Sequence, residues 1–161
     1  FDIVVSFFAF HYISDAQKVL NKIFQLLSPG GQLIIKTAGG NTKAIEEIFE
    51  LPEWANQFTV KENNWHAMAS SEYKKKLEKL GFAEIEAKTV HKTRTFKNTQ
   101  EFVNYAVGWI PFVTGLSGEK AIELAHALAK NLKKHMSANF KNTENVDLVT
   151  PIASIKAQKP I

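Results

Sequence analysis

The sequence has no cysteine and no long apolar run. Without cysteine there can be no disulfide, no thiolate metal ligand and no cysteine nucleophile, which suits a reducing compartment. No apolar run approaches the ~20 residues that cross a bilayer, and the first residues lack the basic start and the cleavage site of a signal peptide. We therefore expect a cytoplasmic protein that does not span a membrane.

Arginine is almost absent, because Arg94 is the only one in a chain whose net charge is +4. A basic chain invites comparison with nucleic-acid-binding proteins, but base readout and bidentate phosphate contacts favour arginine over lysine. The densest basic cluster, 74–76, stands between Glu72 and Glu78, as on a solvated helix face. We predict no nucleic-acid partner.

Several catalytic motifs are missing as well. The five histidines show no H-x-x-x-H or other ligand spacing, so we predict no metal site. There is no G-x-S-x-G serine and no G-x-G-x-x-G loop, which excludes a serine hydrolase elbow and a self-contained nicotinamide site. Tyr73 has no lysine four residues later, which disfavours a short-chain dehydrogenase.

The patterns that are present indicate an α/β domain. Residues 1–8 form an apolar run typical of a fully buried strand, and an amphipathic helix follows over 16–27. Ser14 and Gln17 suggest a capping box at its start. After the Pro-Gly-Gly turn at 29–31, a second apolar strand follows, which predicts a parallel crossover.

The rest of the chain is richer in helices. We expect helices over 42–51, 70–82, 95–112 and 117–136, strands over 83–93 and 148–159, and an irregular connection over 53–69. Proline should end the first and third of these helices, and Gly81 should end the second. Pro151 places the last strand near a sheet edge, or itself stands at the start of that strand. This order suits a sheet whose last strand is antiparallel and follows a helical insertion.

These elements resemble the second half of a class I S-adenosylmethionine-dependent methyltransferase. The resemblance rests on the FD-led strand at Phe1, the loop from Ser6 to Tyr12, the L-x-P-G-G turn at 27–31 and the L-x-x-L-G-F helix end at 77–82. The inserted helices, and NTQEFVNYAVGW above all, resemble the trans-aconitate methyltransferase group. The resemblance implies a Rossmann-like sheet, an antiparallel last strand and S-adenosylmethionine as cofactor.

The resemblance also implies an organisation for the chain. Residues 1–161 would be one partial domain, with 1–40, 70–91 and 147–158 as sheet and flanking helices and 41–69 and 97–140 as a substrate cap. The family's glycine-rich cofactor loop has no counterpart here. We therefore expect the first strands and most of the cofactor site to precede Phe1.

The activity implied is methylation of a small molecule, with O-methylation of a carboxylic acid as the expectation. Methyl transfer from a sulfonium is an in-line displacement that depends on alignment and exclusion of water. A carboxylate is already anionic at pH 7 and needs no general base. We therefore predict no catalytic residue in the strict sense.

Candidate site residues follow from the same resemblance. Cofactor contacts are expected from Ser6, Phe7 and His11, and substrate contacts from His11, Tyr12, Trp65, His66, Tyr105 and Trp109. Several of them have a structural alternative: phenylalanines of the first loop in the core, His11 at a helix start, Trp65 over a core edge, and Tyr105 and Trp109 on a core stripe with Phe102. Arg94 could pair with a carboxylate, although a surface position is favoured.

A second function class stays open. The chain could be a non-catalytic fragment or interaction module that pairs through an open sheet edge, including as a homodimer. A monomer by light scattering would count against this alternative. An RNA-associated methyltransferase has little support from a charge carried by lysine.

Overall fold

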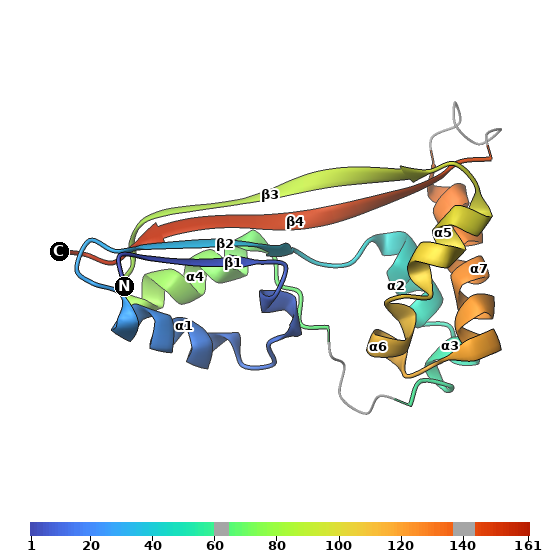
Figure 1. The fold of residues 1–161 in the computed structure, drawn as a ribbon, viewed down its shortest axis with the longest axis horizontal. Coiled ribbons are helices and arrows are strands. Elements are labelled where there is room, and N and C mark those ends of the chain that lie inside the picture. Colours follow the sequence, from blue (N-terminus) through green and yellow to red (C-terminus); the bar gives the residue numbers. More distant parts are fainter. Residues whose placement is uncertain (60–64, 137–143) are drawn as a thin grey trace. The chain divides into compact units, whose positions relative to one another are not determined.

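The computed structural model describes residues 1–59, 65–136 and 144–161, which divide into two compact units (Figure 1). Unit 1 comprises residues 1–40, 65–92 and 150–161, and unit 2 comprises the described residues of 41–64 and 93–149. The ranges expected to form a substrate cap, 41–69 and 97–140, overlap largely with unit 2. Their role as a cap stays a prediction.

A four-stranded sheet with the order β1-β2-β4-β3 organises unit 1. The strands are β1 (Ile3–Phe7), β2 (Gln32–Ala38), β3 (Ala83–Phe96) and β4 (Val146–Gln158), and the last two also contribute residues to unit 2. β1 runs parallel to β2, whereas β4 runs antiparallel to it. The predicted α/β fold with an antiparallel last strand is therefore confirmed.

The position of β4 corrects one expectation. β4 lies between β2 and β3 and is not an edge strand, and Pro151 does not stand at its start, because β4 begins at Val146. Its pairing with β2 ends at Ala38 opposite Ile152, so Pro151 stands one residue beyond that ladder. A proline there removes no hydrogen bond to β2, which is why the interior position tolerates it.

One face of the unit 1 sheet is covered by α1 (Ala16–Leu26) and α4 (Ser70–Leu80), which lie side by side on it (Figure 1). Their apolar stripes meet the inward side chains of the strands and form one continuous core. Its fully or almost fully buried members are Phe10, Ala16, Leu20, Leu27, Leu33, Ile35, Tyr73, Leu77, Phe82, Ala153, Ile155 and Ala157. The helices therefore hold the sheet by hydrophobic burial on a single face.

β1 is an edge strand, and the expectation that it is fully buried is wrong. Ile3, Val5 and Phe7 are 52%, 52% and 61% exposed, while the side chains between them are half-buried. Its continuous apolar run predicts burial on both faces. Within the described part of unit 1, helices cover only the face that receives Val4 and Ser6, so the opposite face stays open.

The helix ends agree in part with the sequence. Gly81 ends α4 in the left-handed conformation, with a φ of 88°, as expected of glycine at this position. The start of α1 differs from the expected capping box, because Asp15 and not Ser14 is the cap. Its carboxylate accepts the Lys18 N–H at 2.9 Å, and its negative charge is also favourable at a helix start.

Unit 2 is built from helices and the distal ends of β3 and β4. The helices are α2 (Lys43–Phe49), α3 (Pro52–Ala55), α5 (Thr99–Ala106), α6 (Ile110–Thr114) and α7 (Gly118–His135). The prediction that Pro111 ends the preceding helix is wrong. The residue lies in the first turn of α6. The first turn tolerates proline because its N–H groups have no partner within the helix.

α7 anchors this unit through an apolar stripe and one polar contact. Ala121, Ala125, Leu128 and Leu132 are buried, as the periodicity predicts. Asn131 is buried too, and its side-chain N–H groups donate to the Ala44 carbonyl at 2.8 Å and to a Glu47 carboxylate oxygen at 2.9 Å. His135 Nε2 lies 2.7 Å from the same oxygen, so α2 and α7 share a hydrogen-bonded cluster. The bond from Asn131, followed by the bond from His135, lowers the pKa of Glu47.

Tyr73 leads to the first prediction. Its ring is fully buried and meets Phe10 edge-on, with centroids 6.0 Å apart, but its hydroxyl has no hydrogen-bond partner among the described residues. Burial, with a smaller contribution from Glu72, raises the pKa of Tyr73 to about 12. Since a buried unpaired hydroxyl is costly, Tyr73→Phe should leave the free energy of unfolding unchanged or raise it by about 1 kcal/mol in urea denaturation.

Tyr73→Ala is the control for loss of the ring itself. It should lower the free energy of unfolding by about 3–5 kcal/mol, as for other buried aromatic side chains. A loss of more than about 1 kcal/mol in Tyr73→Phe would show that the hydroxyl has a stabilising partner.

Candidate functional site

The carboxyl ends of β1 and β2 meet at one edge of the sheet, because parallel neighbours end on the same side. Phe7 is in register with Lys36 there. The chain leaves β1 through a short 3-10 turn, η1 (Phe10–Tyr12), before α1 begins. Ligands of open α/β sheets bind outside the carboxyl ends of the strands, so a binding site is expected at this edge.

His11 and Thr37 form a buried polar pair at this edge. Thr37 is completely buried in β2, and His11 is 4% exposed. The backbone N–H of His11 donates to Thr37 Oγ1 at 3.2 Å, and ring atom Nδ1 lies 2.8 Å from the same oxygen. A hydroxyl that accepts the backbone N–H can still donate its own proton to Nδ1. Burial lowers the pKa of the His11 imidazole, so the ring is neutral at pH 7.

Two aromatic rings pack around His11. The Tyr12 and Trp65 centroids lie 4.0 Å and 4.6 Å from that of the imidazole, and 6.1 Å from each other. The backbone N–H of His66 donates to the His11 carbonyl at 2.7 Å, which fastens the segment before α4 to η1. The structure thus brings together four residues predicted as site residues: His11, Tyr12, Trp65 and His66.

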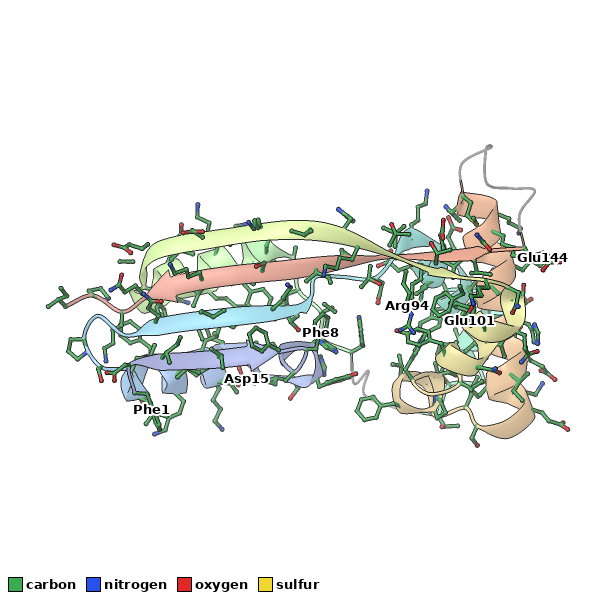
Figure 2. All side chains as sticks on the ribbon, turned by 45° about the horizontal axis from the view of Figure 1, so that its top comes forward. Phe1, Phe8, Asp15, Arg94, Glu101 and Glu144 are labelled. Carbon is green, nitrogen blue, oxygen red and sulfur yellow. The ribbon has the colours of Figure 1, made fainter. Side chains whose placement is uncertain are left out.

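The phenylalanines around the end of β1 have different environments. Phe10 is buried in the core of unit 1, whereas Phe7 and Phe8 are 61% and 49% exposed. Phe8 has a φ of 53°, and its N–H donates to the Lys36 carbonyl at 2.7 Å (Figure 2). A positive φ is unfavourable for phenylalanine, and such residues concentrate at functional sites. Ser6 lies inside β1, half-buried and in register with Ile35.

The other predicted site residues belong to unit 2. Tyr105 and Trp109 share a stripe with Phe102, which is fully buried, and Trp109 packs against the same core. Tyr105 is 37% exposed. Phe102 is therefore a core residue, as the structural alternative for this stripe states. The substrate role of Tyr105 and Trp109 stays a prediction.

Sequence reasoning missed two residues of this site. Thr37 stands at the end of an apolar strand, directly before Ala38 and the Gly39-Gly40 pair, so a search for polar side chains at strand ends could have found it. No signal in the sequence indicates the left-handed backbone conformation of Phe8, since phenylalanine has no preference for it.

The described part of the chain contains no group of three or more histidine, aspartate or glutamate side chains that could hold a metal ion. None of its helices combines the length and apolarity needed to cross a bilayer. A hollow of about 340 Å³ lies within unit 2, lined by residues that include Thr42, Lys43, Leu132, His135 and Asp147.

A family model described as "Methyltransferase domain" matches residues 1–35, the segment that holds β1, η1 and α1. A methyltransferase candidate from Bacillus halodurans C-125 has a similar structure, with a TM-score of 0.59 and 19% identity, over 100% of this chain and 70% of that chain. The fold is that of the S-adenosylmethionine-dependent methyltransferases. No curated protein matches the chain.

Two further structures share this fold. The YcgJ protein of Bacillus subtilis has a TM-score of 0.59 and 14% identity, over 100% of this chain and 64% of that chain. Phosphoethanolamine N-methyltransferase 2 of Haemonchus contortus, solved with phosphomonomethylethanolamine and S-adenosylhomocysteine, has a TM-score of 0.50 and 17% identity. This chain aligns over its whole length with that enzyme but spans only 34% of it.

The buried imidazole leads to a prediction on pH. The pKa of His11 in the folded protein lies below its ordinary value of 6.5, so the unfolded chain takes up the proton first as the pH falls. The stability that the neutral ring contributes is complete above pH 6.5 and is lost as the pH falls toward the folded pKa. Between pH 7 and pH 5, the free energy of unfolding measured in urea should therefore fall more in the wild type than in His11→Gln.

His91→Gln is the matched control, because His91 is an exposed histidine of the same unit. This variant should keep the pH dependence of the wild type. Equal slopes for the wild type and His11→Gln would contradict the assignment of a depressed pKa.

Proposed function

We propose that this chain takes part in S-adenosylmethionine-dependent methyl transfer to a small molecule, with a carboxylic acid as the acceptor. The observation that carries the proposal is the cluster of His11, Thr37, Tyr12 and Trp65. It lies at the carboxyl ends of two parallel strands, in a fold shared with methyltransferases. A cytoplasmic location accompanies the proposal.

The exposed aromatic side chains fit one side of the cofactor. Phe7, Phe8 and Tyr12 are 61%, 49% and 47% exposed and lie at or just beyond the end of β1. A sulfonium cation is attracted to the faces of aromatic rings, and adenine can stack on them. Ser6, Phe7 and His11 are the proposed cofactor contacts. Because the sequence has no glycine-rich loop for the methionine end, we expect these 161 residues alone to bind the cofactor weakly.

The acceptor chemistry follows from the charge state of the site. Bound S-adenosylmethionine supplies an electrophilic methyl group. A carboxylate acceptor needs no base, so the residues around it have only to orient it and exclude water. With Nδ1 held by Thr37, the neutral His11 can offer Nε2–H to a carboxylate oxygen, while Tyr12 and Trp65 exclude water. His66, Tyr105 and Trp109 are the further proposed substrate contacts, as the resemblance to the trans-aconitate group implies.

Ligand binding tests the cofactor part. We expect S-adenosylhomocysteine to raise the melting temperature of the natural protein isolated from its source, and to raise that of the 161-residue chain by less. Intact mass identifies which of the two is being measured. In the natural protein, Tyr12→Ala should weaken binding of S-adenosylmethionine, which carries the sulfonium, by about two- to fivefold, the loss expected for one cation–π contact at an exposed ring.

The control for this experiment is Phe112→Ala, which removes an exposed aromatic ring from unit 2. It should leave the affinity for S-adenosylmethionine unchanged. Absence of any stabilisation of the natural protein would contradict the proposed function.

A second candidate function rests on the edge of the sheet. β1 has one neighbour in the described sheet, and its exposed face carries Ile3, Val5 and Phe7. An apolar edge strand of this kind can add a strand from another chain. The chain would then be a non-catalytic interaction module or a homodimer paired through β1.

Light scattering distinguishes this candidate. If β1 pairs with a second copy, the chain should have a dimeric mass that falls to the monomeric mass in Val5→Lys, because edge lysines oppose strand pairing. Ile122→Lys, at an exposed apolar position of α7, is the control and should leave the mass unchanged. A monomeric wild type over the whole accessible concentration range would contradict the pairing.

A further inference from the structure

The only arginine of the chain lies against two aromatic rings in unit 2. Arg94, labelled in Figure 2, stands two residues before the end of β3. Tyr105 lies in α5. The guanidinium carbon is 4.4 Å from the Tyr105 ring centroid and 4.9 Å from that of Phe96. The two rings are themselves 5.1 Å apart. Phe96 is fully buried, so this group of side chains is anchored in the core of unit 2.

The stacked guanidinium has no acidic partner in the part of the chain that the structure describes. The hydrogen bonds and ion pairs of those residues include none to Arg94. Glu101 accepts the Lys97 backbone N–H at 2.6 Å, as part of the start of α5. Asp147 accepts the hydroxyl of Thr95. Glu101 and Asp147 therefore both accept hydrogen bonds from groups other than Arg94.

The guanidinium carbon lies over the two rings, and no hydrogen bond or ion pair of the described residues uses the guanidinium N–H groups, so these stay available for a ligand. The contacts with Phe96 and Tyr105 also restrict the rotamers of the side chain before any ligand binds, which reduces the entropy lost on binding. Lysine provides the charge at the other nineteen basic positions of the chain. Arginine stands at a position with two aromatic neighbours, where a planar fork differs from a point charge, whereas Lys159 lies over one ring, that of Phe24, at 5.1 Å.

We propose that Arg94, held by Phe96 and Tyr105, is a binding site for a carboxylate on a small molecule. The guanidinium fork can form two parallel hydrogen bonds with a carboxylate, and its single positive charge matches the single charge of that group. The adjacent Tyr105 ring is partly exposed and offers an apolar surface to the rest of the ligand. The site lies within unit 2 and does not depend on the proposed function.

Because there is one arginine, a spectrum of the ¹⁵N-labelled chain contains one arginine Nε–H signal, and this signal reports on Arg94 without further assignment. Titration with benzoate at pH 6 and constant ionic strength should shift it to a saturating value. Benzamide, the uncharged analogue of the same shape, should not. A linear shift, or an equal shift with benzamide, would overturn the proposal. Saturation by inorganic phosphate at lower concentrations than benzoate would overturn the choice of carboxylate.

Variants separate the platform from general attraction between charges. Tyr105→Leu keeps Arg94 and its signal but removes one ring, and should weaken benzoate binding about two- to fivefold. Lys97→Gln removes an exposed charge of the same unit and should leave the affinity unchanged. An equal loss in both variants, or no loss in Tyr105→Leu, would overturn the proposal.

Arg94→Lys keeps the charge and loses the fork. Benzoate binding to this variant is followed through the proton relaxation of benzoate itself, because the arginine signal is gone. We expect the relaxation effect of the wild type to disappear. Undiminished binding would show that any cation suffices at this position and would contradict the assignment. The amide spectrum of each variant shows whether the fold is retained.

Discussion

The antiparallel pairing of β2 with β4 is the constraint on which unit 1 depends. It joins residues 32–38 to residues 152–158 and so places β4 inside the sheet, between β2 and β3. The pairing places Leu33, Ile35 and Ile155 in one core against α1 and α4. Just beyond the ladder, the Gly39 N–H donates to the Pro151 carbonyl at 2.9 Å, and a Cβ at Gly39 would lie 2.9 Å from the Ala153 nitrogen. The strand end that presents Thr37 is therefore held tightly.

The position of His11 in the candidate site depends on this end of β2. Thr37 cannot move without β2, and His11 contacts it through both its backbone N–H and its ring. The imidazole is thus positioned from two sides and kept neutral by burial. A site of neutral, fixed hydrogen-bonding groups with aromatic neighbours is suited to orienting a reactant more than to proton transfer. These properties fit the proposed displacement reaction on an anionic acceptor.

The basic residues of the chain differ in how firmly their side chains are held. In unit 1, the lysines of α4 are solvated, and Lys74 lies 3.9 Å from Glu78 in an exposed pair that contributes little to stability. In unit 2, Arg94 is held against Phe96 and Tyr105. A charge that is positioned before a ligand arrives is more useful for recognition than one that moves freely. Net charge alone conceals this distinction.

Local patterns in the sequence predicted much of the fold. The periods of α1 and α7, the glycine end of α4 and the antiparallel direction of the last strand all agree with the structure. These features depend on side chains within about one helical turn of each other, or on chain order, and both are visible in a sequence. The resemblance to the methyltransferase family, and not a local pattern alone, names His11 and Tyr12 as site residues.

The tertiary structure alone decided what depends on residues far apart in the chain. The open face of β1 follows from its place at the sheet edge, and the interior position of β4 from its insertion between β2 and β3. The contact of Thr37 with His11 spans 26 positions, and the stack of Arg94 on Tyr105 joins a strand to a helix. Local propensity carries no information on such neighbours, because the packing of whole elements chooses them. The sequence by itself determined which elements form, and only their packing determined which side chains meet.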